Sequence, residues 1–301
     1  MEVSRRTAYH RPKDDPKPIA TPESDAPMIR LSAFADEISQ DPREQIDVLT
    51  RHGIRNIEFR AIHGTNVLDL ADARHEAFRD MLRDAGFGLS AIGSPIGKIK
   101  IDEPFEPHLD RFARALDLAE FYDCPRIRVF SFYLPPEKPR DASRDEVMTR
   151  MAELARRALA RGTTLMLENE KGIYGESADH VHDVLATVAS PALRHAFDPA
   201  NYVEVGQPIE EAWTLLKPFV AHLHVKDYSA RERRCVPAGE GDGLFPRLLA
   251  DAAASGYDGF AVLEPHLVVA EQSFGFTGPE RFADAADALK RVLNDQSISF
   301  A

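Results

Sequence analysis

Short apolar runs rich in β-forming residues alternate, from residue 29 onward, with longer segments whose apolar positions recur three and four residues apart. The first pattern is typical of buried strands and the second of amphipathic helices. One strand and one helix together take about 30 residues, which is the spacing of βα units in a parallel sheet. The pattern predicts strands at residues 29–35, 56–60, 87–92, 126–131, 164–168, 193–198, 220–225 and 259–264.

Eight predicted strands, each followed by a helical segment, favour a closed (β/α)8 barrel, the TIM barrel fold, as a single domain. An open, doubly wound sheet is the alternative. Its usual glycine-rich turn after the first strand is absent, because residues 34–38 read Phe-Ala-Asp-Glu-Ile. Helices are predicted at residues 43–51, 73–84, 108–121, 144–160, 178–188, 209–216, 245–254 and 280–293.

The segment before the first strand has a different composition. Residues 1–27 contain five prolines among mixed charges, and Tyr9 is the only aromatic residue there. Such a segment buries too little apolar surface to offset the entropy of ordering. We therefore expect a flexible, disordered tail at residues 1–27 and a barrel at residues 28–301.

Charge and composition narrow the classes of partner. The formal net charge is −12, which disfavours nucleic acid as a partner, because such binding needs a dense basic face. The chain has no apolar run long enough to span a bilayer and no secretory signal, so we expect a cytoplasmic protein with no membrane contact. Cys124 and Cys235 lie outside any CxxC pair and are expected to be reduced thiols. The expected partner is a small molecule, and a homo-oligomer is compatible with the sequence.

Four of the predicted strands carry, at or next to their last position, a residue that can bind a metal: Glu168, Asp198, His224 and Glu264. In a parallel barrel the carboxyl ends of all strands open on one face, so residues distant in sequence converge there. Side chains alternate along a strand, and this alternation directs each of the four residues toward the barrel axis. The same alternation places His195 toward the helices, as a structural residue.

Two glutamates, one aspartate and one histidine form an oxygen-rich donor set with one imidazole. This set favours Mn²⁺, with Mg²⁺, Co²⁺ and Zn²⁺ as alternatives, over a structural zinc site. Carboxylates gathered in one cavity repel each other and would take up protons, whereas a dication keeps them ionised. We expect one divalent ion per chain.

These strand ends resemble a known family. The segments Leu-Glu-Asn-Glu at 167–170, Phe-Asp-Pro-Ala-Asn at 197–201, His-Leu-His-Val-Lys-Asp at 222–227 and Leu-Glu-Pro-His at 263–266 are similar to the xylose isomerase-like sugar phosphate isomerase/epimerase family of TIM barrels. Gly-Glu-Gly-Asp at 239–242, and the segments 34–39 and 94–98, support the resemblance, which covers roughly residues 29–295.

The resemblance implies a metal held by Glu168, Asp198, His224 and Glu264, which binds hydroxyl and carbonyl oxygens of a ketose-like substrate. The two glutamates would double as acid and base on opposite faces of the reacting carbon. The chain departs from the free-ketose 3-epimerases of this superfamily at three supporting positions, which argues against that subgroup. The residues at these positions are Tyr174, Asn201 and Ala230.

Further residues near the strand ends are candidates for substrate binding. Arg60 shares the inward side of its strand with Glu58, and it can bind an anionic substrate group or form a salt bridge inside the barrel. Lys98 can reach an anionic group or remain an exposed loop residue. His222 lies one layer deeper than His224 and is assigned to its support. The full set of candidate substrate-binding residues is Arg60, Lys98, Asn201, His222, Lys226 and His266.

The leading hypothesis is a metal-dependent isomerase or epimerase of a small sugar, sugar phosphate or related polyhydroxy carbonyl compound, acting through an enediolate. A lyase of the keto-inositol dehydratase type would use the same site and differ only in expelling a hydroxide. A relative of the apurinic endonucleases is disfavoured by the net charge of −12 and by Asn201, where that relative would place a histidine. A barrel that binds sugar without catalysis is a further alternative. The substrate, its phosphorylation, the native metal and the oligomeric state stay open.

Overall fold

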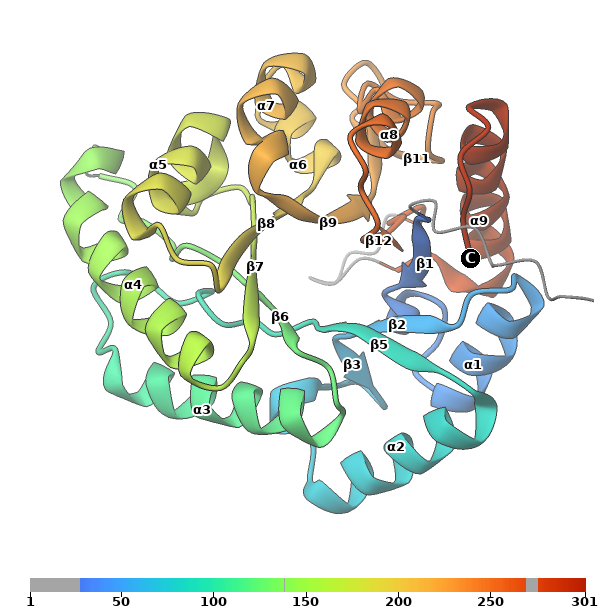
Figure 1. Cartoon of the computed structure of the whole chain (residues 1–301), viewed down its shortest axis with the longest axis horizontal. Helices are drawn as coiled ribbons and strands as arrows, with labels where there is room; N and C mark the ends of the chain where they lie inside the picture. Colours follow the sequence, from blue (N-terminus) through green and yellow to red (C-terminus); the bar gives the residue numbers. More distant parts are fainter. Residues whose placement is uncertain (1–27, 138, 269–275) are drawn as a thin grey trace, which may run out of the picture.

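The computed structural model describes residues 28–137, 139–268 and 276–301. Eight parallel strands close into a barrel that is surrounded by helices (Figure 1). The fold is a TIM barrel, as the sequence predicts, whereas the predicted tail at residues 1–27 lies outside the described residues. Around the barrel the strands follow in the order β1 (Arg30–Ala33), β12 (Phe260–Leu263), β9 (Val220–Val225), β8 (Leu193–Phe197), β7 (Thr164–Glu168), β6 (Arg126–Val129), β5 (Gly88–Ile92) and β2 (Asn56–Phe59).

Long helices cover the outside of the barrel, and each corresponds to a predicted helix (Figure 1). They are amphipathic, and their apolar faces pack on the strands. No helix in the described part of the chain combines the length and apolar character needed to cross a bilayer. These helices are α1 (Pro42–Arg51), α2 (Asp72–Ala85), α3 (Glu106–Phe121), α4 (Arg144–Ala160), α5 (Ala178–Val188), α7 (Ile209–Leu216), α8 (Phe245–Ala254) and α9 (Gly278–Asp295).

Several short elements after the strands were not predicted from the sequence, because they are too short for apolar positions to recur at a regular spacing. They include the 3-10 helix η1 (Ala35–Glu37) and helix α6 (Pro199–Glu204). Two small antiparallel hairpins also extend the loops. The hairpins consist of β3 (Ala61–Ile62) with β4 (Thr65–Asn66), and of β10 (Asp227–Ser229) with β11 (Arg234–Val236).

The predicted alternation along the strands is present in the structure. In β7, Leu165 and Leu167 are fully buried in the main hydrophobic core. His195 of β8 lies on the same side, and its Nδ1 lies 2.7 Å from the carbonyl oxygen of Leu167, so this histidine is structural. Inside the barrel, Phe34, Phe260 and Val262 form a separate buried cluster.

Candidate active site

Glu168, Asp198, His224 and Glu264 converge at the carboxyl ends of β7, β8, β9 and β12. One ligand atom from each of the four lies within 4.8 Å of the others, and all four residues are buried. His224 Nδ1 lies 3.2 Å from Glu168 Oε1 and 3.5 Å from Glu264 Oε2. The structure therefore brings together the residues that the sequence singles out as metal ligands.

The cluster has the properties of a cation site. Glu168 Oε2 and Glu264 Oε2 are buried and accept no hydrogen bond from the described residues. Burial raises the pKa of Asp198 to about 6, although the charge of Lys226 acts in the opposite direction. Burial would also raise the pKa of Glu168, but His224 and Arg128 outweigh it and hold the pKa below its ordinary value. The charges of Glu168 and Glu264 also raise the pKa of Asp198, and a divalent cation in the cluster would keep this buried carboxylate ionised.

Asp198 is held in place by the start of α6. Its Oδ1 accepts the backbone N–H of Asn201 at 3.0 Å, so the carboxylate caps this helix while Oδ2 stays in the cluster. The side chain of Asn169 bonds the backbone N–H and C=O of Asp198 at 3.0 and 2.9 Å. Asn201 in turn donates its side-chain N–H to the carbonyl of Asn169 at 2.9 Å. Asn201, a predicted substrate contact, thus uses this donor to join the ends of β7 and β8.

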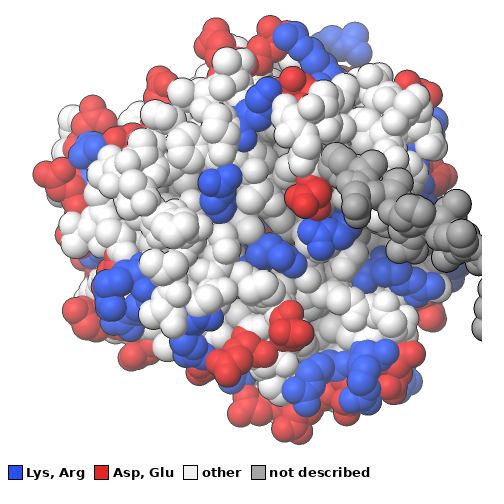
Figure 2. Space-filling model, in the orientation of Figure 1, with Lys and Arg blue, Asp and Glu red and all other residues white. Residues whose placement is uncertain are grey.

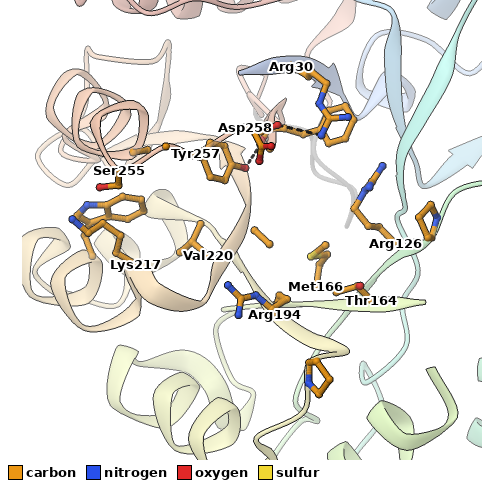
Figure 3. A pocket seen from close by; sticks show the side chains of 18 residues that line it. Arg30, Arg126, Thr164, Met166, Arg194, Lys217, Val220, Ser255, Tyr257 and Asp258 are labelled. Atoms are coloured by element: carbon orange, nitrogen blue, oxygen red, sulfur yellow. Dashed lines mark hydrogen bonds between the residues drawn. The ribbon is translucent and has the colours of Figure 1, made fainter. Parts of the chain in front are cut away.

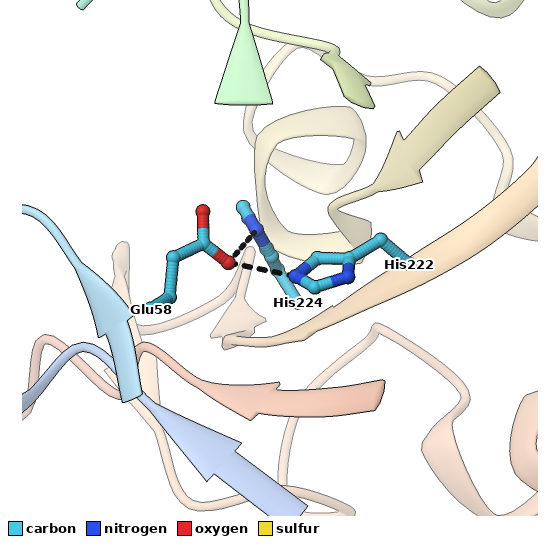
Figure 4. Close-up of side chains that lie close together, drawn as sticks. All are labelled: Glu58, His222 and His224. Carbon is cyan, nitrogen blue, oxygen red and sulfur yellow. Dashed lines mark hydrogen bonds and ion pairs between the residues drawn. The ribbon is translucent and has the colours of Figure 1, made fainter. Parts of the chain in front are cut away.

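The carboxylate of Glu58, which reaches from β2 into the barrel interior, holds His224 in place (Figure 4). Glu58 Oε2 lies 2.7 Å from His222 Nε2 and 3.4 Å from His224 Nε2, and none of the three side chains is exposed. Burial would raise the pKa of Glu58, but the two imidazoles hold it well below its usual range. A carboxylate on the second ring nitrogen fixes the orientation of a ligating histidine. His222 lies in this deeper layer, against Glu58 rather than at the opening.

Arg60 of the segment after β2 lies between acidic side chains. Its Nε is 2.7 Å from Asp36 Oδ2, and its Nη1 is 3.0 Å from Glu264 Oε1. The guanidinium also stacks over the ring of Phe34, 4.7 Å from the centroid. Of the two roles open to Arg60 in the sequence, the structure contains the salt bridge inside the barrel.

Arg128 of β6 also belongs to the site, although the sequence pattern does not single it out. Its Nη1 lies 3.4 Å from Glu168 Oε2, and its Nε lies 3.9 Å from Glu58 Oε1. Its guanidinium stacks over Phe34 at 4.9 Å. The alternation along β6 already indicates an inward side chain at this position, but its carboxylate partners lie on other strands.

The sequence profile of xylose isomerase-like TIM barrels matches residues 46–292. The chain belongs to the xylose isomerase-like TIM barrel family. Comparison with curated proteins gave no match.

Solved structures of several other proteins share this fold. The family protein of Mycobacterium smegmatis, solved in complex with magnesium, is 21% identical with a TM-score of 0.68, over 90% of this chain and 98% of that one. The probable 3-DHS dehydratase AsbF of Bacillus anthracis is 17% identical with a TM-score of 0.67, over 87% and 98%. The 3-keto-D-glucoside 4-epimerase YcjR of E. coli is 16% identical with a TM-score of 0.65, over 89% and 99%.

Two predicted substrate contacts of this xylose isomerase-like barrel lie directly beside the cluster. Lys226 Nζ lies 2.8 Å from Asp198 Oδ2 and 3.8 Å from Glu264 Oε2. His266 Nε2 lies 3.5 Å from Glu264 Oε1 and 3.1 Å from Glu37 Oε1. Burial would lower the pKa of Lys226, but the neighbouring carboxylates raise it well above its ordinary value.

Lys98 lies farther out, in the loop after β5. Its Nζ lies 3.0 Å from Glu170 Oε2, and the side chain is partly exposed. It also contacts the ring of Phe130, 4.2 Å from the centroid. Lys98 and Glu170 thus form an ion pair among the loops that follow β5 and β7.

Proposed function

We propose that this protein is a divalent-metal-dependent isomerase or epimerase of a small sugar, sugar phosphate or related polyhydroxy carbonyl compound. The observation that carries the proposal is the buried convergence of Glu168, Asp198, His224 and Glu264 within 4.8 Å. Mn²⁺ suits this donor set, and Mg²⁺ is the ion in the Mycobacterium smegmatis relative. A 3-keto-D-glucoside 4-epimerase among the proteins of the same fold supports the reaction class.

A divalent ion in such a cluster polarises a carbonyl group and lowers the cost of removing the adjacent proton. Glu168 and Glu264 are the residues that move this proton. They stand on β7 and β12, which are separated around the barrel by β8 and β9, so they approach a central ligand from different sides. One takes the proton and the other returns it on the opposite face.

The arginines position these two glutamates. Arg60 bonds Glu264 at 3.0 Å, and Arg128 lies 3.4 Å from Glu168, so each carboxylate has one oxygen beside a guanidinium. Each glutamate keeps a second oxygen in the cluster. Lys226, at 2.8 Å from Asp198, is placed to donate a hydrogen bond to a substrate oxygen beside the metal ligands.

A lyase of the keto-inositol dehydratase type is the second candidate. The probable 3-DHS dehydratase of the same fold supports it. Both reactions begin with removal of a proton beside a carbonyl, and they differ in whether a hydroxide then leaves. Product analysis distinguishes them, because dehydration lowers the substrate mass by one water. A sugar-binding barrel without catalysis would give neither product.

A small molecule rather than a nucleic acid is the partner that the charges favour. The net charge is −12, and acidic and basic side chains are interspersed on the face seen in Figure 2. Phosphate backbones are bound by clustered lysines and arginines. The cytoplasmic location and the homo-oligomer remain predictions from the sequence.

The metal site is tested by metal analysis of purified variants. We expect about one divalent ion per chain in the wild type and its loss in Asp198→Ala and His224→Ala, because no neighbour replaces the missing ligand. Glu170→Ala is the matched control, since Glu170 lies near the opening but pairs with Lys98. Full occupancy in both ligand variants would falsify the assignment.

The acid/base pair is tested with Glu168→Gln and Glu264→Gln. The amide keeps an oxygen for the metal but cannot transfer a proton, so metal is retained while turnover falls by about 10² to 10⁴-fold. In deuterated water, the variant that lacks the base also loses exchange of the substrate proton, measured by NMR. Glu120→Gln should leave both unchanged, because Glu120 is exposed on α3 and pairs with Arg161. Normal turnover in either of the first two variants contradicts the mechanism.

A further inference from the structure

A cavity lies at the end of the barrel where the strands begin (Figure 3). Its volume is about 480 Å³. Residues from the starts of β1, β6, β7, β8 and β12 line it, among them Arg30, Arg126, Thr164, Arg194 and Phe260. The metal-ligand cluster lies at the carboxyl ends of the strands, so the two sites are on opposite faces of the barrel.

Three arginines from three different strands surround this cavity in Figure 3. Each is anchored by a hydrogen bond to a backbone carbonyl: Arg30 to Asp258 at 3.2 Å, Arg126 to Ser90 at 2.5 Å and Arg194 to Pro218 at 3.0 Å. A guanidinium carries five N–H donors, so most donors of each arginine remain for other partners.

The three arginines form no ion pair within the described part of the chain. Among the described residues, no carboxylate oxygen lies within 4.0 Å of a guanidinium nitrogen of Arg30, Arg126 or Arg194. The lining also includes Lys217, which pairs with Asp251 at 2.9 Å, and the carboxylate of Asp258. The arginines near the metal-ligand cluster differ, because Arg60 and Arg128 both face carboxylates.

The ring of Phe260 holds two of the guanidiniums. The guanidinium carbon of Arg30 lies 4.1 Å from the ring centroid, and that of Arg126 lies 5.0 Å from it. Stacking on an aromatic face leaves the edges of a guanidinium, where its N–H groups point, available to an oxyanion. None of the three arginines is fully buried, so solvent reaches them.

We propose that this cavity binds a small multivalent oxyanion, bearing phosphate or carboxylate groups, between Arg30, Arg126 and Arg194. Like charges gathered around one cavity repel each other, and an anion relieves this repulsion while it satisfies the N–H donors. A volume of about 480 Å³ is within the range of small-molecule sites. The site uses none of the residues of the proposed active site and does not depend on its activity.

The test is isothermal titration calorimetry with pyrophosphate and with citrate, on the protein as purified and again after its metal has been removed with EDTA and the EDTA exchanged for chelator-free buffer. We expect saturable binding that persists after metal removal and is weakened at least about tenfold in Arg126→Gln and in Arg194→Gln. Arg156→Gln is the control of equal charge change, because Arg156 is exposed and pairs with Glu153. Stronger binding of pyrophosphate identifies a phosphate ligand, and stronger binding of citrate a carboxylate ligand.

Folding of each variant is checked by circular dichroism. Arg30→Gln replaces a variant that does not fold, because Arg30 is exposed at the start of its strand. Absence of saturable binding of both anions would overturn the proposal. So would equal affinity in Arg126→Gln and Arg156→Gln. Binding that is lost once the metal has been removed, in buffer free of EDTA, belongs to the metal-ligand cluster and would also overturn it.

Discussion

Asp227 shows how one side chain shapes the opening of the barrel. It follows Lys226 and is almost fully buried. Its Oδ2 accepts the backbone N–H groups of Gly239 and Gly241 at 2.9 and 3.1 Å, and its Oδ1 accepts those of Tyr228 and Gly243, both at 2.9 Å. A Cβ at Gly241 would lie 2.4 Å from Oδ1, so this loop wraps closely around the carboxylate.

The first prediction is that Asp227→Asn destabilises the protein. The amide has only one acceptor oxygen, so two of the four N–H groups lose their partner. A buried donor left without an acceptor costs about 1–3 kcal/mol, and we expect a loss of about 2 kcal/mol or more in urea unfolding. The control is Glu240→Gln in the same loop, where the side chain is exposed. Equal unfolding midpoints in the two variants would show that the carboxylate does not hold the loop.

Single residues of the site were predictable to different degrees. Glu168, Asp198, His224 and Glu264 could be found because each ends an apolar strand, and a barrel directs all strand ends to one face. The partners of these residues could not be found in this way. Alternation along β6 gives the side to which Arg128 points, but its contact with Glu168 depends on how the barrel closes.

At the scale of elements, the loop after β5 packs tightly on the segment after β6. Gly97 has φ +93°, and a Cβ there would lie 2.0 Å from the carbonyl oxygen of Phe130. The N–H of Gly97 donates to His108 Nε2 of α3 at 2.8 Å. This close approach fixes the start of the loop that carries Lys98.

The second prediction distinguishes two reasons why alanine is unfavourable at Gly97: the collision of its methyl group with the backbone of Phe130, and the positive φ angle. Gly97→Ala should lower the free energy of unfolding by about 3 kcal/mol or more, because the methyl group collides with backbone. Gly162→Ala is the control, since Gly162 also has positive φ, +64°, but nothing lies within 4 Å of its added Cβ. We expect about 1 kcal/mol there. Equal losses in chemical denaturation would mean that the loop can move aside.

The long elements were predictable and the short ones were not. Eight strands and the helices between them follow from apolar periods that extend over several turns or alternations. Helix α6 has six residues and follows Asp198, whose carboxylate both caps it and lies in the cluster. Such an element depends on tertiary contacts, because it is too short to be stable alone.

At the scale of the whole molecule, buried histidines make stability depend on pH. Burial lowers the pKa of His75, His108 and His195 to about 4. His108 Nε2 accepts the N–H of Gly97, and protonation would remove this acceptor. The folded state keeps these residues neutral, whereas the unfolded chain binds protons below pH about 6.5. The neutral histidines therefore contribute fully to the free energy of unfolding above pH about 6.5. This contribution is lost as the pH falls toward 4.

The third prediction is that the free energy of unfolding falls between pH 6.5 and 4, and that His108→Gln flattens this dependence. A glutamine oxygen can accept the N–H of Gly97 without titrating. A pKa depressed to about 4 corresponds to about 3 kcal/mol for one such residue. His63→Asn at an exposed site is the control, since its φ of +51° suits asparagine. A slope in His108→Gln equal to that of the wild type would contradict this role.

Barrel closure has a consequence for how the chain is made. The last strand, β12, pairs with the first, β1, so that Arg30 is in register with Phe260, and the Arg60 to Glu264 bond spans 204 positions. During translation the edge of β1 stays without this partner until nearly the whole barrel sequence has been synthesised. Unpaired strand edges invite aggregation, and contacts so distant in sequence form slowly. Nascent chains that terminate before residue 260 therefore present both an open sheet edge and a ligand set without Glu264.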